Sequence, residues 1–334
     1  MRKILYINIQ RGAGVRLIGN LFLSILEKIK YLDIDEYKSN CLKQAKQFQI
    51  DNKYEFCLFN DVPFPVKNDE NHTTTILLNK IREKNIPIIS IAHNYGFYNP
   101  RVDYQFVLNG NSKLCKNFFS INFVSGNIWE NYNKRRFDKN RFLIPIRLDK
   151  IDFDVLKNLK EKNPSFEFDA YCLTHGKKSQ DIIDKYKDVF TYKGYVTLNK
   201  MVDKYNEYSN VLIPSKSECL CMPIREGLQC GCDVYVYLKE HINNYAQVLS
   251  NYIYYLNRQG DIIHTPTKYS DDFNNVFNME NMILQFLFYL RGLFNINLYF
   301  DKNHKNNITC LAEDEIKNPV CYKGNSFIIN KLQL

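Results

Sequence analysis

Two glutamates, Glu218 and Glu226, follow an apolar run at 210–215, NVLIPS, that is typical of a buried strand. Pro223 suits the first position of a helix, which predicts a helix over 223–230 with Glu226 in its first turn. The N-terminus of a helix favours an anion such as a phosphate. Two carboxylates beside a phosphate need neutral partners, and a ribose diol and a sugar hydroxyl would serve. The arrangement therefore favours a nucleotide sugar, which offers all three groups in a row.

The residues around the two glutamates form a longer pattern, P-S-x-x-E-x-x-x-x-P-x-x-E-x-x-x-C-G, from Pro214 to Gly231. This pattern resembles the signature of retaining glycosyltransferases of the GT-B type, in particular glycosyltransferase family 4. The resemblance implies an α/β protein with the GT-B fold, in which two Rossmann-like doubly wound domains face a central cleft. In that family the first glutamate contacts the donor sugar and the second hydrogen-bonds the nucleotide ribose. Carried over, Glu218 is the sugar contact at the reaction centre and Glu226 is the ribose contact.

One departure from the family pattern follows the first glutamate. The family usually has glycines at two positions that are Cys219 and Cys221 here. Glycine lets the backbone approach a ligand closely, so the pocket is expected to be tighter in this chain. The backbone N–H groups of Leu220 and Cys221 could still face the donor. The identity of the sugar, and activity itself, stay open on this point.

The resemblance places further site residues in loops of both halves. His93, after a buried apolar run, matches a family histidine that contacts the donor sugar or the reaction centre. Lys177 and Lys178 stand where the family has a basic pair that stabilises the leaving diphosphate, although the usual arginine is not clearly present. Gly12 and Gly14 lie between the first strand and the first helix, where glycines let backbone N–H groups approach an anion. The alternatives are a satisfied loop histidine, a solvated lysine pair and a plain tight turn.

Short runs rich in Ile, Val, Tyr and Phe alternate with helical patterns, which indicates repeated βα units and parallel sheets. The 334 residues suffice for two domains, and the polar stretch at 148–168 separates two such series. We therefore expect an N-terminal Rossmann-like domain over 1–150, on the acceptor side, and a C-terminal one over 151–334, on the donor side. The expected strands are 3–9, 54–60, 86–92, 104–109, 121–125, 141–146, 169–173, 189–194, 210–215, 233–238 and 252–256, and the expected helices are 17–32, 179–187, 198–208 and 223–230.

Four thiols gather in the same stretch as the glutamates, at Cys219, Cys221, Cys230 and Cys232. A zinc site of four cysteines usually has two C-x₂₋₄-C pairs joined by a loop, whereas here two C-x-C pairs flank a helix. Free cysteine is also among the most buried residue types. We therefore expect these cysteines to be small packing residues, with a zinc-dependent interaction module as the alternative.

The net charge of the chain is +9, from 45 Lys and Arg against 36 Asp and Glu, which favours anionic partners. No signal peptide is recognised. The longest apolar run, at 282–294, is interrupted by Gln285 and Arg291 and falls short of the ~20 residues of a transmembrane helix. The chain is thus expected in the cytoplasm or at the periphery of a membrane, with its thiols reduced.

The reaction implied by the resemblance is transfer of a sugar from a nucleotide-diphosphate donor to a hydroxyl acceptor, with retention and without a metal cofactor. The acceptor can be a glycan, a lipid-linked group or hydroxymethylated DNA, and steep salt dependence of acceptor binding would favour DNA. The main alternative is a non-catalytic nucleotide-sugar-binding protein of the same fold. A sugar epimerase of similar fold fits the spacing of the two glutamates less well.

Overall fold

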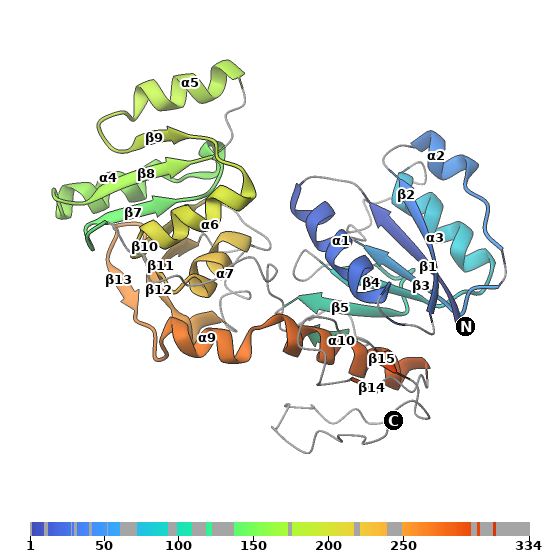
Figure 1. The fold of residues 1–334 in the computed structure, drawn as a ribbon. Coiled ribbons are helices and arrows are strands. Elements are labelled where there is room, and N and C mark those ends of the chain that lie inside the picture. Colours follow the sequence, from blue (N-terminus) through green and yellow to red (C-terminus); the bar gives the residue numbers. More distant parts are fainter. Residues whose placement is uncertain are drawn as a thin grey trace.

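Two separate β-sheets form the frame of the molecule (Figure 1). The computed structural model describes residues 2–9, 13–27, 29, 32–39, 42–51, 53–60, 72–92, 99–108, 118–121, 137–172, 176–216, 221–238, 249–294, 299–300 and 310–311.

The first sheet has six parallel strands in the order β2-β1-β3-β4-β5-β6. Its chain order reverses beside β1, because β2 lies on one side of that strand and all later strands lie on the other. This is a doubly wound arrangement. The strands are β1 (Arg2–Ile9), β2 (Leu32–Ser39), β3 (Phe56–Asn60), β4 (Ile88–Ala92), β5 (Tyr104–Leu108) and β6 (Phe118–Ile121), and the helices between them are α1 (Ala13–Leu26), α2 (Leu42–Gln47) and α3 (Thr73–Glu83).

Side chains of the first sheet alternate between two buried faces, as expected for parallel strands covered on both sides. One face, including Tyr6 and Leu58, packs with Phe22 of α1. The opposite face, including Ile7, packs with Leu77 of α3. Helices on both faces therefore bury the sheet, and only the ends of its strands remain for a ligand.

The second sheet has seven strands in the order β13-β12-β11-β10-β7-β8-β9, of which all but β13 are parallel. Its chain order reverses between β7 and β10, which again makes it doubly wound. Its strands are β7 (Arg141–Ile144), β8 (Glu167–Tyr171), β9 (Thr191–Gly194), β10 (Asn210–Ser215), β11 (Asp233–Leu238), β12 (Ile253–Leu256) and β13 (Ile262–His264); the helices are α4 (Phe153–Lys162), α5 (Gly176–Lys185), α6 (Leu198–Glu207), α7 (Met222–Gln229) and α9 (Ser270–Val276), with 3₁₀ turns η1 (Leu148–Lys150) and η3 (Ser250–Tyr252).

One strand belongs to the other sheet from the one that the sequence suggested, and one helix packs on the other sheet's domain. Strand β7, expected in the first domain, pairs with β8 and β10 of the second sheet. Helix α10 (Met279–Phe294) runs from α9 back along the first domain (Figure 1). Both exchanges rest on tertiary contacts, since a strand's residues do not encode which sheet it joins. The domain boundary expected at residue 150 stays a prediction.

Several expected elements also differ locally. The helix predicted over 17–32 begins and ends earlier, as α1, and Leu32 opens strand β2 instead. The polar stretch at 148–168, which separates the two series of elements, contains η1 and α4. The strand expected at 121–125 is found at Phe118–Ile121. A two-stranded antiparallel pair, β14 (Tyr299–Phe300) with β15 (Cys310–Leu311), completes the described elements.

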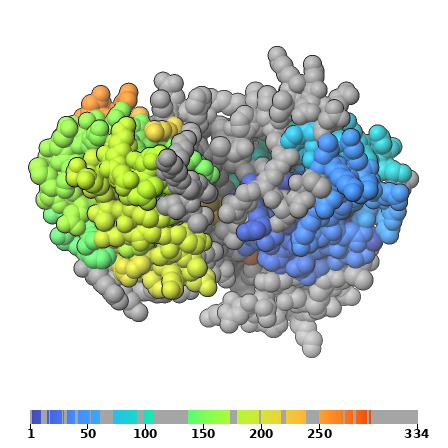
Figure 2. Space-filling model, turned by 90° about the horizontal axis from the view of Figure 1, so that it is seen from above, coloured from blue at the N-terminus to red at the C-terminus, as the bar shows by residue number. Residues whose placement is uncertain are grey.

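None of the described helices combines the length and the apolar character that crossing a bilayer requires. The apolar run at 282–294 is instead the core of α10, and its Phe286 and Leu290 are fully buried. Figure 2 shows the two domains as two lobes, with residues of the first in blue and of the second in green and yellow.

Candidate functional site

The point where the second sheet reverses its chain order lies between β7 and β10, and open α/β sheets bind ligands outside the carboxyl ends of strands at such a point. The end of β10 is fixed there by backbone hydrogen bonds to the segment after β7. The N–H of Asp152 donates to the carbonyl of Pro214 at 2.7 Å, and the N–H of Lys216 donates to the carbonyl of Lys150 at 2.8 Å. The loop that follows, with Glu218 and Leu220, therefore leaves from a fixed edge, although both residues lie outside the described ones.

Helix α7 follows this loop, and its sequence explains where the helix begins and why it packs closely against the sheet. Cys221 is the N-cap with φ −73° and ψ 86°, a conformation that needs no glycine, and a proline stands in the first turn. Gly227 lets the helix approach the sheet, since a Cβ there would lie 3.0 Å from the Cγ2 of Val234 and 3.2 Å from that of Val211. Figure 1 shows α7 on the side of the second sheet nearer the first domain.

Glu226 lies in the second turn of α7, since the first turn contains no acidic residue; its predicted place in the first turn was wrong. Its side chain is buried, and its Oε2 accepts a hydrogen bond of 2.9 Å from the hydroxyl of Tyr205 on α6. Burial raises the pKa of Glu226 to about 7, while the Tyr205 hydrogen bond and the charge of Arg225 oppose this rise. A buried carboxyl that titrates near neutral pH is a common feature of functional sites.

Arg225, the neighbour of Glu226, is the largest fully buried side chain of the described residues. Its Nη1 lies 3.5 Å from the carbonyl oxygen of Cys221, one turn back toward the start of α7. A guanidinium keeps its charge under burial. Its position therefore places a fixed positive charge in the helix that carries Glu226.

Three of the four clustered cysteines are described, and all three are buried in the core of the second domain, as expected of packing residues. The Sγ of Cys232 lies 3.2 Å from the carbonyl oxygen of Tyr205 and 3.5 Å from that of Tyr208, so its single proton has either oxygen as an acceptor. Within the described part of the chain no three His, Cys, Asp or Glu side chains come together as a metal site would need. Cys219 lies outside it, so the zinc alternative is not tested.

A polar cluster occupies the corresponding reversal point of the first sheet, between β1 and β3. The Nδ2 of Asn60 donates to the Oδ1 of Asn8 at 3.3 Å and to the carbonyl of Val15 at 3.2 Å. The Nδ2 of Asn8 donates in turn to Glu36 at 2.9 Å. These bonds fix the first turns of α1 on the sheet. Gly14 is part of α1 rather than of the preceding loop, where it was expected.

Of the remaining predicted site residues, the structure describes the backbone of some and leaves others outside the described residues. Lys177 and Lys178 stand in the first turn of α5, which follows β8, in keeping with their expected place at a helix start. Gly12 and His93 lie outside the described residues. The structure thus brings Cys221 and Glu226 together on one helix, and it does not place Glu218, His93 or the lysine side chains relative to them.

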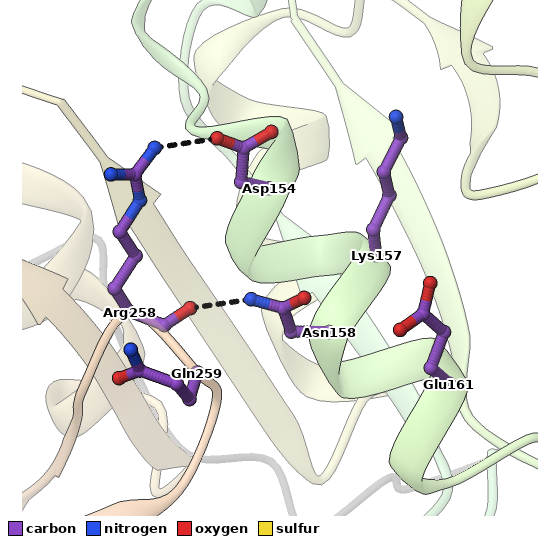
Figure 3. Close-up of a pocket in the computed structure, with 6 residues that line it drawn as sticks. All are labelled: Asp154, Lys157, Asn158, Glu161, Arg258 and Gln259. Carbon is purple, nitrogen blue, oxygen red and sulfur yellow. Dashed lines mark hydrogen bonds and ion pairs between the residues drawn. The ribbon is translucent and has the colours of Figure 1, made fainter.

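A surface hollow of ≈ 380 Å³ lies elsewhere on the second domain, between α4 and the turn that joins β12 to β13 (Figure 3). Arg258 of that turn donates to Asp154 at 2.7 Å, and its carbonyl accepts from Asn158 at 2.9 Å. The hollow is thus lined by side chains that bind one another across it. None of the predicted site residues lines it, so we do not assign it a ligand.

Sequence reasoning missed Tyr205, Asn8 and Asn60. An asparagine at the end of each of two apolar strands is a signal that could have identified the pair, since buried polar residues need partners. Tyr205 gives no such signal, because its bond to Glu226 joins two helices with a strand between them.

Comparison with known proteins defines the fold. No protein-family model and no curated protein matches the chain by sequence. Among solved structures, a sucrose-phosphate synthase from Thermosynechococcus elongatus is similar, with a TM-score of 0.63 and 10% identity over 88% of this chain and 100% of that one. A glycosyltransferase from Rickettsia africae has a TM-score of 0.62 and 12% identity over 88% of this chain and 99% of that one. AviGT4, a glycosyltransferase of avilamycin A biosynthesis, has a TM-score of 0.53 and 11% identity over 89% of this chain and 99% of that one. The chain therefore has the GT-B fold, with two Rossmann-like domains.

Proposed function

We propose that this protein is a glycosyltransferase that moves a sugar from a nucleotide-diphosphate donor to a hydroxyl acceptor, with retention of the anomeric configuration. The observation that carries the proposal is the position of Glu226. This buried carboxylate lies on the helix that follows β10, at the reversal point of the second sheet, inside a motif whose spacing resembles that of retaining family 4 enzymes. The proteins of similar fold support the same class, since two of the three are glycosyltransferases by name.

In the proposed complex the nucleotide ribose donates hydrogen bonds to Glu226, and the donor sugar contacts Glu218. The diphosphate lies against the start of α7, and the backbone N–H groups of Leu220 and Cys221 are proposed to donate hydrogen bonds to it. Lys177 and Lys178 add positive charge at the start of α5, and Gly12, with Gly14 beside it, lets the backbone approach from the first domain. The groups proposed to face the diphosphate are all positive or neutral, as an anionic leaving group requires.

The transfer step breaks the bond between the anomeric carbon and the diphosphate oxygen and forms a bond from the acceptor oxygen to the same face of that carbon. The acceptor proton passes to the departing diphosphate, so that no enzyme carboxylate need act as a base. His93 is proposed to contact the sugar at the reaction centre. Closure of the domains would exclude water and favour transfer over hydrolysis. The step needs no metal ion, and transfer should therefore persist in EDTA.

A thermal-shift screen tests the donor site directly. The purified protein is heated with UDP, GDP, ADP or CMP, and with their sugars, and a nucleotide that binds only the folded state should stabilise it by about 3 kcal/mol at a hundredfold excess over Kd. Glu226→Ala should abolish the ligand-induced shift. Glu161→Ala, on the outer face of α4, should retain it. Stabilisation by no nucleotide, or equal stabilisation of all three proteins, would contradict the proposed site.

The two alternative functions, a non-catalytic binder and a zinc-dependent module, predict different results for the same purified protein. A non-catalytic binder would show the nucleotide-dependent shift without release of the nucleoside diphosphate over any acceptor panel. A zinc-dependent module would contain stoichiometric zinc by elemental analysis of the purified protein.

The acceptor panel should hold a glycan, a lipid-linked phosphate and hydroxymethylated DNA, each at two salt concentrations, because neutralised phosphates make binding to DNA steeply salt-dependent. Reduced, buried thiols fit a place in the cytoplasm or at the surface of a membrane facing it.

A further inference from the structure

Tyr205 lies outside the motif that defines the proposed donor site, on the helix that precedes β10. Its side chain is fully buried, and its hydroxyl oxygen lies 2.9 Å from the Oε2 of Glu226 and 3.5 Å from the carbonyl oxygen of Pro223. A hydroxyl has a single proton to donate. The shorter distance and the negative charge both assign that proton to the carboxylate.

This bond divides the two oxygens of Glu226 between two tasks. Oε2 is held by the phenol from α6, whereas Oε1 accepts no hydrogen bond from the described residues. A carboxylate with one oxygen fixed can present the other in a single direction. That is the geometry that recognition of a ribose hydroxyl needs, because a freely rotating side chain would lose rotamer entropy on binding.

The electrostatic surroundings make the Tyr205 bond more important than it would be at the surface. Burial disfavours the charged form of Glu226, and among the described groups that face it the Tyr205 hydroxyl and the guanidinium of Arg225 lower its pKa. Burial, followed by the charge and hydrogen bond of Glu226, raises the pKa of the Tyr205 phenol. The thiols of Cys230 and Cys221 add smaller contributions in the same direction, so the phenol stays a donor.

We propose that Tyr205 is a positioning residue of the nucleotide site: its hydroxyl fixes Glu226 Oε2, so that Oε1 is presented to a ribose hydroxyl of the ligand. This inference rests on the proposed function, since it needs a nucleotide at Glu226. It goes beyond that function because it assigns the selection of ribose over deoxyribose, and the pH range of binding, to a residue outside the motif.

The test is calorimetric titration of the full chain with UDP, and with GDP and ADP if UDP does not bind, from pH 5.5 to 8.5. The 2′-deoxy and 3′-deoxy forms of the nucleotide that binds are titrated in parallel. Wild-type affinity should rise with pH to a plateau, because ribose hydroxyls donate to the ionised carboxylate. In Tyr205→Phe the midpoint of this rise should move to higher pH by about one pH unit, which is about tenfold in affinity at pH 6. The preference for ribose over its deoxy forms should fall.

Tyr208→Phe is the matched control. Tyr208 is also fully buried, three residues further along, and its hydroxyl donates to a different buried carboxylate, Asp169, at 2.6 Å. This variant should lose stability and keep the wild-type midpoint and ribose preference. If Tyr205→Phe also keeps the wild-type midpoint and the wild-type ribose preference, the positioning role is wrong while the proposed function stands. If no nucleotide binds the wild type, the proposed function fails first, and this inference with it.

Tyr205→Phe is nearly isosteric, but a second replacement keeps the test decisive if that variant does not fold. Site-specific 3-fluorotyrosine at position 205 retains the hydroxyl and makes it a stronger donor. The midpoint should then move to lower pH, opposite to the phenylalanine variant. A midpoint unchanged from wild type would overturn the proposal, since a merely structural tyrosine has no reason to shift it in either direction.

Discussion

The rings of Phe286 and Phe22 meet edge to face, with their centroids 5.0 Å apart, and this contact joins helix α10 to helix α1. Phe106 of β5 meets the same ring of Phe286 at 5.2 Å. The preceding helix, α9, stays with the second domain, where Phe273 and Phe277 pack around Tyr252. The α9–α10 segment therefore binds both domains, and its apolar sequence serves this bridge.

Phe286→Ala should destabilise the protein by about 3–5 kcal/mol, because it removes a fully buried ring from contacts with both α1 and β5. Phe288, two residues further along α10, is 58% exposed, and Phe288→Ala should change stability by less than about 1 kcal/mol. Equilibrium unfolding in urea measures both. Similar losses in the two variants would show that α10 is not seated on the first domain by this face.

Gly19 is the point of closest approach of α1 to the first sheet. A Cβ there would lie 2.2 Å from the Nδ2 of Asn60 and 2.5 Å from the Oδ1 of Asn8, so one of these buried partners must move. We expect Gly19→Ala to cost about 1–3 kcal/mol through overpacking and loss of the asparagine pair. Gly292→Ala, in α10, is the control, since nothing lies within 4 Å of its Cβ position.

The control should be neutral or stabilising by up to about 1 kcal/mol, since alanine is the better helix former. Thermal unfolding followed by circular dichroism distinguishes the two glycines. A Gly19→Ala protein as stable as Gly292→Ala would mean that α1 lies further from β1 and β3 than the structure shows.

The carboxylate of Asp169, on β8 of the second domain, interacts with three donor side chains. It accepts from the Nε of Arg141 and from the hydroxyl of Tyr208, both at 2.6 Å, and lies 3.5 Å from the Nζ of Lys193. Asp169→Ala should cost about 3 kcal/mol, because the partly buried guanidinium of Arg141 loses its buried carboxylate and keeps the exposed one of Glu167, 3.5 Å away. Asp154→Ala removes the carboxylate of an exposed pair and should cost less than about 1 kcal/mol. Urea unfolding at pH 7 compares them, and equal losses would contradict a buried network at Asp169.

The sequence predicts those features that depend on local pattern. The buried strands with continuous apolar runs, such as β10 and β11, were found at the predicted residues, because burial on both faces leaves an unbroken hydrophobic run. The start of α7 was predicted within one residue from Pro223. The doubly wound fold followed from the alternation of strands and helices.

Features that depend on distant partners were not predictable in this way. Strand β2 has the polar sequence LDIDEYKS and was not among the expected strands. It is an edge strand whose Asp35 binds Lys3 of β1 at 2.7 Å. Charged residues are common on edge strands because they prevent pairing with other chains. The sheet to which β7 belongs, and the partner of Glu226, likewise depend on contacts that no local window contains.

Glu226 should make the stability of the protein depend on pH. Its pKa of about 7 in the folded state lies above the ordinary value of 4.5 for a glutamate, so the folded state binds the proton more tightly than the unfolded state. The contribution of this group is therefore most favourable below pH 4.5 and is lost as the pH rises through about 7. Between pH 5.5 and 8.5 the loss should be on the order of 2 kcal/mol.

Glu226→Gln removes this titration while keeping the shape of the side chain and an oxygen that accepts from Tyr205. The free energy of unfolding of the variant, minus that of the wild type, should therefore increase from pH 5.5 to pH 8.5. Urea unfolding of both proteins at three pH values gives this difference, in which other titrating groups cancel. A flat difference would mean that Glu226 is ionised across the whole range, as a carboxylate open to water would be, and the buried site proposed for the ribose would have to be abandoned.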